Sequence, residues 1–431
     1  MQSKIVVYCL LVIMITLFNC TKNKVIKRPP NIIYILADDL GYGDLSCYGQ
    51  EKFSTPNIDQ LAAEGMLFTQ HYSGATVCAP SRSALMTGLH TGHTPIRGNK
   101  EIYPEGQHPI FDKYITIAEI LKQKGYKTGA FGKWGLGFPG SEGDPLNQGF
   151  DEFYGCKCQA QAHRYYPYHL WKNNEKVILE GNLGLNEQTY APSLIHDKTL
   201  EFIKKNKDRP FFAYVASPLP HAELRVPEKQ LNKYRNKFLP EKSYDGCDVL
   251  CKQTNFGGYS SQHEGHAAFA GMINLLDEQV GEIVRKLREL GLENNTLLIF
   301  SSDNGPHQEG GADPEYFNSN GVYRGFKRDL YEGGIRVPMI AKWPAKIKDN
   351  SESGHISTFW DVMPTIAGIT KAEKPGNLDG ISFLPTLLGQ NNQEQLEYLY
   401  WGFHELGGRR AIRMGMGGCS IQCKYRSSNR F

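Results

Sequence analysis

Four oxygen-bearing side chains stand in two short pairs of this 431-residue sequence, Asp38-Asp39 and Asp303-Asn304. Three carboxylates and an amide oxygen suit a hard divalent cation, Ca²⁺ or Mg²⁺, better than zinc. Either pair alone could simply cap a helix, because Asp and Asn accept hydrogen bonds from backbone amides there. If the two pairs meet in space, their carboxylates would repel one another without a cation, so together they predict a metal site.

Both pairs directly follow runs of apolar, β-branched residues that are typical of buried parallel strands. The runs 31–37 and 296–300 precede the acidic pairs, and the run 210–216 precedes the segment that ends in His221. A shorter run of this kind covers 337–341. Ligands of open α/β sheets bind at the carboxyl ends of the strands, so we expect these polar groups to converge there.

Amphipathic segments at 116–124 and 266–289 lie between these runs and predict helices. Alternating strands and helices are typical of an α/β fold in which a large, mostly parallel sheet lies between helices. Because the chain exceeds an average domain in length, a smaller second unit is also expected.

The N-terminus predicts export from the cytoplasm. Lys4 precedes an apolar stretch at 5–18 that is short for a membrane span and typical of a signal peptide. The sequence Asn19-Cys20 resembles the end of a bacterial lipobox, which predicts a lipoprotein signal over 1–20 and a polar tether over 21–30. An ordinary secretory signal and a membrane anchor are the alternatives. The mature protein would then work in the periplasm, at the outer membrane or at the cell surface.

Composition indicates an ordinary soluble globular protein. A net charge of +3 and a hydrophobic content of 40% give no indication of a nucleic-acid partner. Of the 10 cysteines, Cys247 and Cys251 could pair in an oxidising compartment. No histidine accompanies the cysteine pairs at zinc-finger spacing, so a structural zinc site is not expected.

A second reactive element is the run Cys78-Ala79-Pro80-Ser81-Arg82. A free cysteine is most often a small buried apolar residue, and five residues alone leave that interpretation open. Together with other motifs in the same order, however, the run resembles the C-x-P-S-R element of the formylglycine-dependent sulfatases. Those motifs are Ala37-Asp38-Asp39-Leu40-Gly41, Gly132-Lys133-Trp134, Pro220-His221, Ser302-Asp303-Asn304-Gly305 and Tyr331-Glu332-Gly333-Gly334. The resemblance extends from Asn31 to about Arg413 and implies an alkaline-phosphatase-like fold.

The resemblance implies both the cofactors and the roles of the site residues. Cys78 would be oxidised by a formylglycine-generating enzyme, and the hydrated aldehyde would be the nucleophile. A Ca²⁺ ion, with Mg²⁺ as the weaker alternative, would be held by Asp38, Asp39, Asp303, Asn304 and the modified residue 78. Lys327, placed by its spacing from the Tyr331 motif, would join Arg82 and Lys133 around the sulfate. His221 would contact sulfate and, kept charged by nearby anions, protonate the departing oxygen.

One position departs from the resemblance. The family usually reads Gly-Lys-Trp-His-Leu-Gly, whereas this chain has Gly135 in place of the histidine. That histidine normally touches the diol and helps to eject sulfate from the sulfated residue 78. The departure predicts either a slower second step or a different base, for which His307 is a candidate.

The end of the sequence also departs from the family. Residues 401–415 resemble the start of a smaller C-terminal α+β subdomain, and a basic tail of unmatched sequence follows at 416–431. This pattern predicts a truncation or a shifted reading frame. We therefore expect a catalytic domain at 31–345, a C-terminal region at 346–415 with part of the smaller subdomain, and the unmatched tail.

The expected activity is hydrolysis of sulfate esters of a carbohydrate. The aromatic-rich segment 163–169 and the predicted lipid anchor favour a glycan, and O-sulfated galactose or N-acetylgalactosamine is the substrate that the resemblance implies. Ordinary loop packing is the other interpretation of that segment.

One alternative function is a phosphonate or phosphate ester hydrolase of the same fold. A second metal site built with histidines would favour that alternative, but the sequence shows no clustered histidine pair. Another alternative is an inactive glycan-binding lipoprotein, suggested by Gly135 and the unusual terminus.

Overall fold

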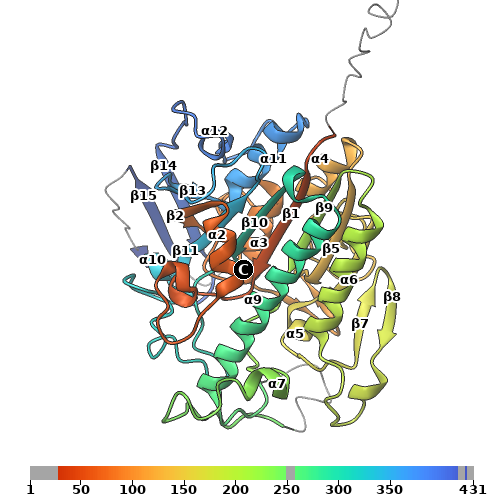
Figure 1. Cartoon of the computed structure of the whole chain (residues 1–431), viewed down its shortest axis with the longest axis vertical. Helices are drawn as coiled ribbons and strands as arrows, with labels where there is room; N and C mark the ends of the chain where they lie inside the picture. Colours follow the sequence, from red (N-terminus) through yellow and green to blue (C-terminus); the bar gives the residue numbers. More distant parts are fainter. Residues whose placement is uncertain (1–27, 249–257, 416–422, 425–431) are drawn as a thin grey trace, which may run out of the picture.

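The computed structural model describes residues 28–248, 258–415 and 423–424, so the predicted signal peptide and most of the tether lie outside the described residues. Its main element is an 11-stranded sheet (Figure 1). In spatial order the strands are β12 (Ser351–Ser353), β2 (Met66–Tyr72), β11 (Arg336–Lys342), β10 (Thr296–Ser302), β1 (Asn31–Ala37), β9 (Phe211–Ala216), β5 (Lys127–Lys133), β6 (Glu152–Cys156), β7 (His169–Lys172) and β8 (Glu175–Ile178), with β13 (Ser357–Thr358) also paired to β2.

The centre of this sheet is parallel. β10, β1, β9, β5 and β6 run in one direction, and the three longer apolar runs predicted from the sequence form β1, β9 and β10. The fourth run forms β11, which is antiparallel to both β10 and β2. The prediction of an α/β fold with a large, mostly parallel sheet is confirmed, and the antiparallel pairs lie toward its two sides.

Successive residues of β1 face opposite sides of the sheet, as the two-residue period of a strand requires. Ile33 and Ile35 join one hydrophobic core, and Ile32 and Tyr34 join the other. The first core is shared with α2 (Pro56–Ala63), α6 (Ala191–Lys205) and α9 (Gly265–Glu289), and the second with α3 (Cys78–Thr87), α4 (Ile117–Gln123) and α11 (Val362–Thr370). Because β1 is buried on both sides, its apolar run is continuous rather than alternating.

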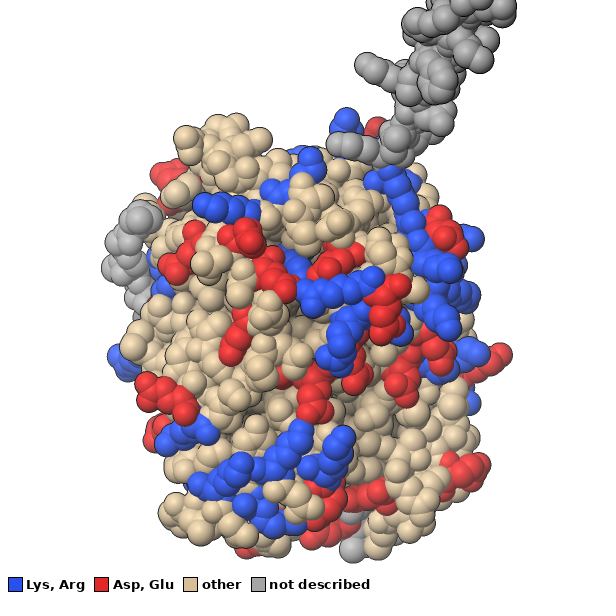
Figure 2. Space-filling view, viewed as in Figure 1, with Lys and Arg blue, Asp and Glu red and all other residues tan. Residues whose placement is uncertain are grey.

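The remaining described elements are short. They are β3 (Glu101–Ile102), β4 (Gly106–Gln107), α5 (Gln159–Ala162), α7 (Glu228–Leu231), α10 (Glu332–Ile335) and α12 (Leu384–Leu387). In the part of the chain described here, no helix combines the length and the apolar character that a membrane span requires. On the face shown in Figure 2, lysine and arginine side chains are interspersed with aspartate and glutamate.

A separate antiparallel sheet consists of β14 (Tyr398–Phe403), β15 (Arg409–Met414) and β16 (Cys423–Lys424). The region predicted at 346–415 is thus divided, since β12 and β13 belong to the large sheet. Residues 423–424 of the expected tail pair with β15. Cys247 is disulfide-bonded, whereas Cys251 lies outside the described residues.

The small sheet is fastened to the segment that leads into α3. The buried Trp401 indole donates to Ser73 O at 2.9 Å, and Arg413 Nη1 donates to Tyr72 Oη at 2.6 Å. In the segment that follows α3, the backbone amide of Asn99 donates to Glu405 Oε1 at 2.6 Å; Glu405 lies between β14 and β15. The small sheet therefore supports the helix that begins at Cys78.

We predict that Trp401→Ala lowers the free energy of unfolding by about 3–5 kcal/mol, because it leaves a cavity where the indole packs and removes its hydrogen bond. Denaturant-induced unfolding followed by circular dichroism measures the change. Trp401→Phe, which keeps most of the ring volume, should cost clearly less. Equal stability of the wild type and Trp401→Ala would show that the small sheet contributes nothing through this contact.

Candidate active site

The predicted site residues meet at the carboxyl end of the parallel strands. Asp38 and Asp39 follow β1, Asp303 follows β10 and Lys133 is the last residue of β5. His221 lies in the loop after β9, and Cys78 is the first residue of α3. Their side chains are buried, and the hydrogen bonds described below join them, so the convergence expected from the strand ends is present in the structure.

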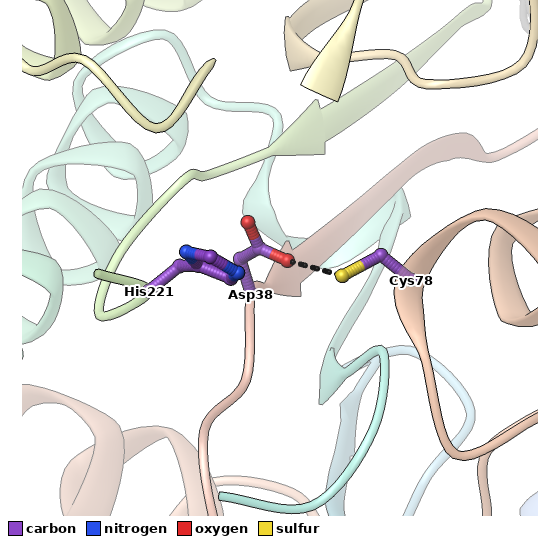
Figure 3. Close-up of side chains that lie close together, drawn as sticks. All are labelled: Asp38, Cys78 and His221. Atoms are coloured by element: carbon purple, nitrogen blue, oxygen red, sulfur yellow. Dashed lines mark hydrogen bonds between the residues drawn. The ribbon is translucent and has the colours of Figure 1, made fainter. Parts of the chain in front are cut away.

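The Cys78 thiol points toward the Asp38 carboxylate (Figure 3). Its sulfur lies 3.4 Å from Asp38 Oδ1, 3.8 Å from Asp39 Oδ1 and 3.3 Å from Lys133 Nζ. Burial, and after it the charge of Asp303, raises the pKa of Cys78 well above its usual value. Although a helix N-terminus favours a thiolate, these effects prevail and leave Cys78 a neutral thiol, which is a poor nucleophile.

The three carboxylates of the site are matched by three cations. Lys133 Nζ lies 2.6 Å from Asp38 Oδ2, Lys327 Nζ lies 2.7 Å from Asp39 Oδ2, and an Arg82 nitrogen lies 2.8 Å from Asp303 Oδ2. Arg82 also reaches Asp38 Oδ1 at 3.2 Å. Burial is the largest single effect on Lys133 and opposes its charge, but Asp38 and the other acidic neighbours together outweigh burial and raise the lysine pKa. Repulsion among the carboxylates is thus largely offset by side chains, which the sequence argument for a cation had not considered.

Two further observations fit a divalent cation. Among the described residues, Asn304 Oδ1 is buried and has no hydrogen-bond partner, while its amide nitrogen contacts Asp39 Oδ1 at 2.6 Å. Burial, followed by the charge of Asp38, raises the pKa of Asp303 to about 7, and a bound cation would favour its ionised form. Ligand atoms of Asp38, Asp39, Cys78 and Asp303 all lie within 4.8 Å of one another. These donors fit a hard cation such as Ca²⁺.

Two glycine-containing motifs of the sequence meet directly after Asp303 and Asn304. The Gly305 amide donates to Gly334 O at 3.0 Å, and a Cβ at Gly305 would lie 2.0 Å from Gly333 O. Any larger residue would push the two backbones apart. The Tyr331-Glu332-Gly333-Gly334 motif therefore positions Asp303 and Asn304 rather than contributing ligands itself.

The start of α3 is held by two polar side chains, one of which the sequence analysis overlooked. Ser81 Oγ donates to Asp303 O at 2.5 Å and accepts from the Gly74 amide at 3.0 Å. Asn99 Oδ1 accepts from the Ala79 amide at 3.1 Å, although no local pattern places it near the Cys78 run. Both bonds fix the orientation of residue 78.

His221 is held as a neutral imidazole. Its Nδ1 lies 2.5 Å from Ala222 O, and its Nε2 faces Lys327 Nζ at 2.9 Å, so Nδ1 carries the proton and Nε2 accepts. Burial, followed by Lys327, lowers the pKa of His221 well below its usual value despite the nearby carboxylates. The expectation that neighbouring anions keep His221 charged therefore does not hold for this arrangement.

His221 is the middle ring of three stacked histidines. His163 lies against one side of it with ring centroids 4.1 Å apart and planes 8° apart, and His307 stacks on it at 5.3 Å and 18°. The sequence analysis saw no clustered histidine pair, because these three residues lie far apart along the chain. The structure corrects that interpretation.

His307, the candidate for replacing the missing histidine, is occupied at both ring nitrogens. The Glu309 amide donates to Nδ1 at 3.2 Å, so Nε2 carries the proton and donates to Pro220 O at 3.2 Å. This tautomer has no lone pair free to accept a proton. Gly135 itself has φ +75°, a conformation that favours glycine over histidine or other residues with a Cβ.

Glu309 is a site residue that the sequence analysis missed. Its Oε2 lies 3.3 Å from Lys327 Nζ and 3.7 Å from His221 Nε2, and it accepts a hydrogen bond from Tyr259 at 2.9 Å. Its other oxygen pairs with Arg328. It is more exposed than Asp39, the other carboxylate paired with His221: its side chain is 18% exposed, whereas that of Asp39 is fully buried.

The aromatic segment 163–169 is largely structural. Tyr165 is buried, and its hydroxyl donates to Pro218 O and His221 O, both at 2.7 Å. Arg164 is buried against Glu223 at 2.9 Å. Tyr165 thus shapes the loop that carries His221, which favours the packing interpretation of this tyrosine.

Comparison with known proteins agrees with this geometry. A family model described as sulfatase matches residues 30–372, and a second, described as N-sulphoglucosamine sulphohydrolase, C-terminal, matches residues 321–424. The second match extends into the segment 416–431 that the sequence analysis set apart as unmatched. The chain therefore belongs to the sulfatase family, as a type I sulfatase of the alkaline-phosphatase-like superfamily, and is a sulfuric ester hydrolase.

Individual relatives share most of the fold. Human arylsulfatase A is 32% identical over 90% of this chain and 74% of its own length. The N-acetylgalactosamine-6-O-sulfatase of Bacteroides thetaiotaomicron is 32% identical over 85% of this chain and 78% of its own. The crystal structure of Ps i-CgsB in complex with k-i-k-neocarrahexaose is similar with a TM-score of 0.74 and 28% identity, covering 90% of this chain and 82% of that one.

We predict that Asp303→Asn weakens Ca²⁺ binding by about tenfold or more, equivalent to ~1.4 kcal/mol, because a carboxylate ligand becomes a neutral amide of the same shape. Isothermal titration of chelator-treated protein measures the affinity. Asp329→Asn is the matched control, since this carboxylate pairs with Arg409 away from the cluster and should leave the affinity unchanged. Equal affinity of Asp303→Asn and the wild type would exclude Asp303 as a ligand.

Proposed function

We propose that the protein is an exported sulfatase that hydrolyses sulfate esters of a carbohydrate, using a formylglycine made from Cys78 and a bound Ca²⁺. The observation that carries this proposal is the position of Cys78. Its side chain lies between carboxylates that fit a metal and a lysine that fits an anion, yet burial keeps the thiol protonated. A neutral buried thiol is not an activated nucleophile, so this position needs a different nucleophile, which a formylglycine diol made by a formylglycine-generating enzyme would supply.

The metal would be held by Asp38, Asp39, Asp303, Asn304 and the modified residue 78. A bound Ca²⁺ supplies charge that polarises a sulfate oxygen and favours ionisation of a nearby hydroxyl. With the carboxylates already matched by three cations, the cation would make the site net positive. A sulfate monoester is an anion, so such a site would attract it.

Arg82, Lys133 and Lys327 would stabilise the sulfate group. All three are buried beside Cys78 or its carboxylate neighbours, where a charge acts more strongly than in water. Lys133 Nζ is already 3.3 Å from the Cys78 sulfur, so it can reach an oxygen atom bonded to residue 78. Their charges would offset the negative charge that develops as the S–O bond breaks.

His221 would protonate the departing oxygen. The imidazole is neutral beside Lys327, but a sulfate group bound between them would draw the lysine charge toward itself and favour the imidazolium. Its Nε2 faces the carboxylate cluster at 3.2 Å from Asp39 Oδ2, on the side where residue 78 lies (Figure 3). The proton would then pass from Nε2 to the alcohol oxygen as it leaves.

The names of the relatives support a carbohydrate substrate. The Bacteroides relative is an N-acetylgalactosamine-6-O-sulfatase, and Ps i-CgsB was solved with a neocarrahexaose. We therefore propose sulfated galactose or N-acetylgalactosamine as the substrate class. Glu309, partly exposed beside His221, is suited to accept hydrogen bonds from sugar hydroxyls.

Export is proposed from the N-terminal sequence, in which an apolar stretch at 5–18 is followed by Asn19-Cys20. The disulfide bond of Cys247 supports an oxidising compartment. The protein would then be periplasmic, or it would be attached to the outer membrane by a lipid on Cys20. In the second case it could face the cell surface.

We predict that Cys78→Ala abolishes sulfate release while the fold and Ca²⁺ affinity are largely retained, because the nucleophile is lost but four ligands remain. The mature wild type is assayed on N-acetylgalactosamine 6-sulfate, galactose 6-sulfate and 4-nitrophenyl sulfate, with 4-nitrophenyl phosphate as the control for phosphate ester hydrolysis. Cys47→Ala, at a free cysteine away from the site, should remain active.

Substantial sulfate release by Cys78→Ala would contradict the proposed mechanism. Faster turnover of the phosphate ester than of every sulfate ester would favour the phosphatase alternative. A wild type with formylglycine at residue 78 but no activity on any ester would favour the glycan-binding alternative.

A further inference from the structure

The proposed reaction needs a proton acceptor in its second half. After sulfate transfer, Cβ of residue 78 carries one hydrogen, one hydroxyl group and the sulfate. To regenerate the aldehyde, the Cβ–O bond to sulfate breaks and its electron pair leaves with sulfate. The hydroxyl oxygen forms the C=O double bond, and its proton must pass to a base. Sulfate then departs, and water hydrates the aldehyde for the next cycle.

Most titratable groups of the site are unsuited to take that proton. Asp38, Asp39 and Asp303 are engaged in ion pairs and would hold the metal. Lys133 Nζ and Lys327 Nζ are ion-paired with the buried carboxylates of Asp38 and Asp39, so both already hold their protons. The base must therefore be sought among the three stacked imidazoles.

Two of those imidazoles have no free lone pair in the structure. The Nε2 lone pair of His221 accepts from Lys327, and the Nδ1 lone pair of His307 accepts from the Glu309 amide. The Nε2 atom of His163 is different: it is buried and has no hydrogen-bond partner among the described residues. Leaving a buried polar atom unpaired is destabilising, so such an atom at a site indicates a missing partner.

His163 lies within the charged cluster although its residue number gives no hint of it. It stacks on His221 at 4.1 Å, and His221 in turn lies 3.2 Å from Asp39, whose carboxylate contacts Cys78. Burial, followed by His221 and Lys133, lowers the pKa of His163 well below its usual value. The imidazole is therefore neutral in the free protein and a weak base there, and the negative charge of a sulfated residue 78 would raise its pKa.

The helix that carries His163 occupies the space beside Gly135. His163 ends α5, whose first residue, Gln159, places its Cγ 3.2 Å and its Nε2 3.3 Å from where a Cβ of residue 135 would lie. The Gln159 amide nitrogen is also buried without a partner among the described residues. Gln159, at the start of α5, therefore lies where a residue-135 side chain would otherwise be, and His163, with its own unsatisfied nitrogen, directly follows the end of the same helix.

We propose that His163 is a catalytic residue of this chain, whose Nε2 accepts the hydroxyl proton of the sulfated residue 78 as sulfate leaves. The inference rests on the proposed function, because it assigns a residue to the second step of that reaction. It also removes the reason to expect a slow second step from Gly135. The wild type should release the alcohol and sulfate at the same rate without an initial burst.

The test uses His163→Phe, which keeps an aromatic ring against His221 but has no ring nitrogen, and His163→Gln as a second variant that cannot act as a comparable base. His307→Phe is the matched control, because His307 is the other ring that stacks on His221. Each mature protein is mixed rapidly with N-acetylgalactosamine 6-sulfate or 4-nitrophenyl sulfate, whichever the wild type hydrolyses faster. Alcohol and sulfate are measured separately, and the mass of the peptide that contains residue 78 is determined after acid quenching.

Both His163 variants should release about one equivalent of alcohol in a burst, followed by turnover slowed roughly 10²- to 10⁴-fold, the range for loss of a general base. In both His163 variants the peptide that contains residue 78 should be mainly sulfated. In the wild type and in His307→Phe the same peptide should be mainly unsulfated. The sulfated peptide distinguishes this role from a structural one, since misfolding would block sulfation as well. Ca²⁺ affinity and thermal unfolding confirm that each variant is folded.

Three results would overturn the inference. One is an unsulfated residue 78 in both His163 variants with alcohol release lost, which places His163 in the first step. Another is a raised KM with no sulfated peptide, which makes His163 a substrate-recognition residue. The third is equal accumulation in His307→Phe. A formylglycine-containing wild type that hydrolyses neither ester would contradict the proposed function itself, and this outcome is seen before any variant is compared.

Discussion

The structure depends on keeping three carboxylates together in a space that excludes water. Ionised groups in such a place are costly unless each is paired, and here Arg82, Lys133 and Lys327 supply the pairs from three different parts of the fold. The pairing restrains the ends of β1, β5 and β10 relative to α3. The same three cations are those that would face sulfate, so one set of charges both stabilises the free protein and prepares it to receive an anion. A bound cation would make the net charge of the site positive and so favour binding of the anion.

Much of this arrangement could be predicted from the sequence. Continuous apolar runs located β1, β9 and β10, and the polar residues directly after them located the carboxylate cluster, because both signals are local. Features that depend on non-local contacts were not predicted. The sequence did not show that β11 is antiparallel, that Asn99 holds the start of α3, or that Glu309 lies beside His221. Each depends on contacts between segments distant in sequence, for which neither composition nor periodicity carries a signal.

The histidines illustrate the same limit at the level of chemistry. His221 and His307 could be singled out by their motifs, but which nitrogen is free depends on the backbone groups around each ring. Both ring nitrogens of His307 are occupied, whereas His163, which had been grouped with a possible sugar-binding surface, stacks on His221 and has a buried, unpaired nitrogen. The loss of a side chain at Gly135 and the approach of α5 are coupled, because Gln159 occupies the vacated space.

The central claim is that residue 78 acts as an oxidised carbon centre beside a metal and not as a thiol. The most direct test is the mass of the residue-78 peptide from protein made in a host with a formylglycine-generating enzyme, compared across preparations with their rate of sulfate release. The account predicts a peptide with the mass of formylglycine, in a fraction that rises in proportion to activity. Full activity in a preparation whose residue 78 is entirely unmodified cysteine would contradict it.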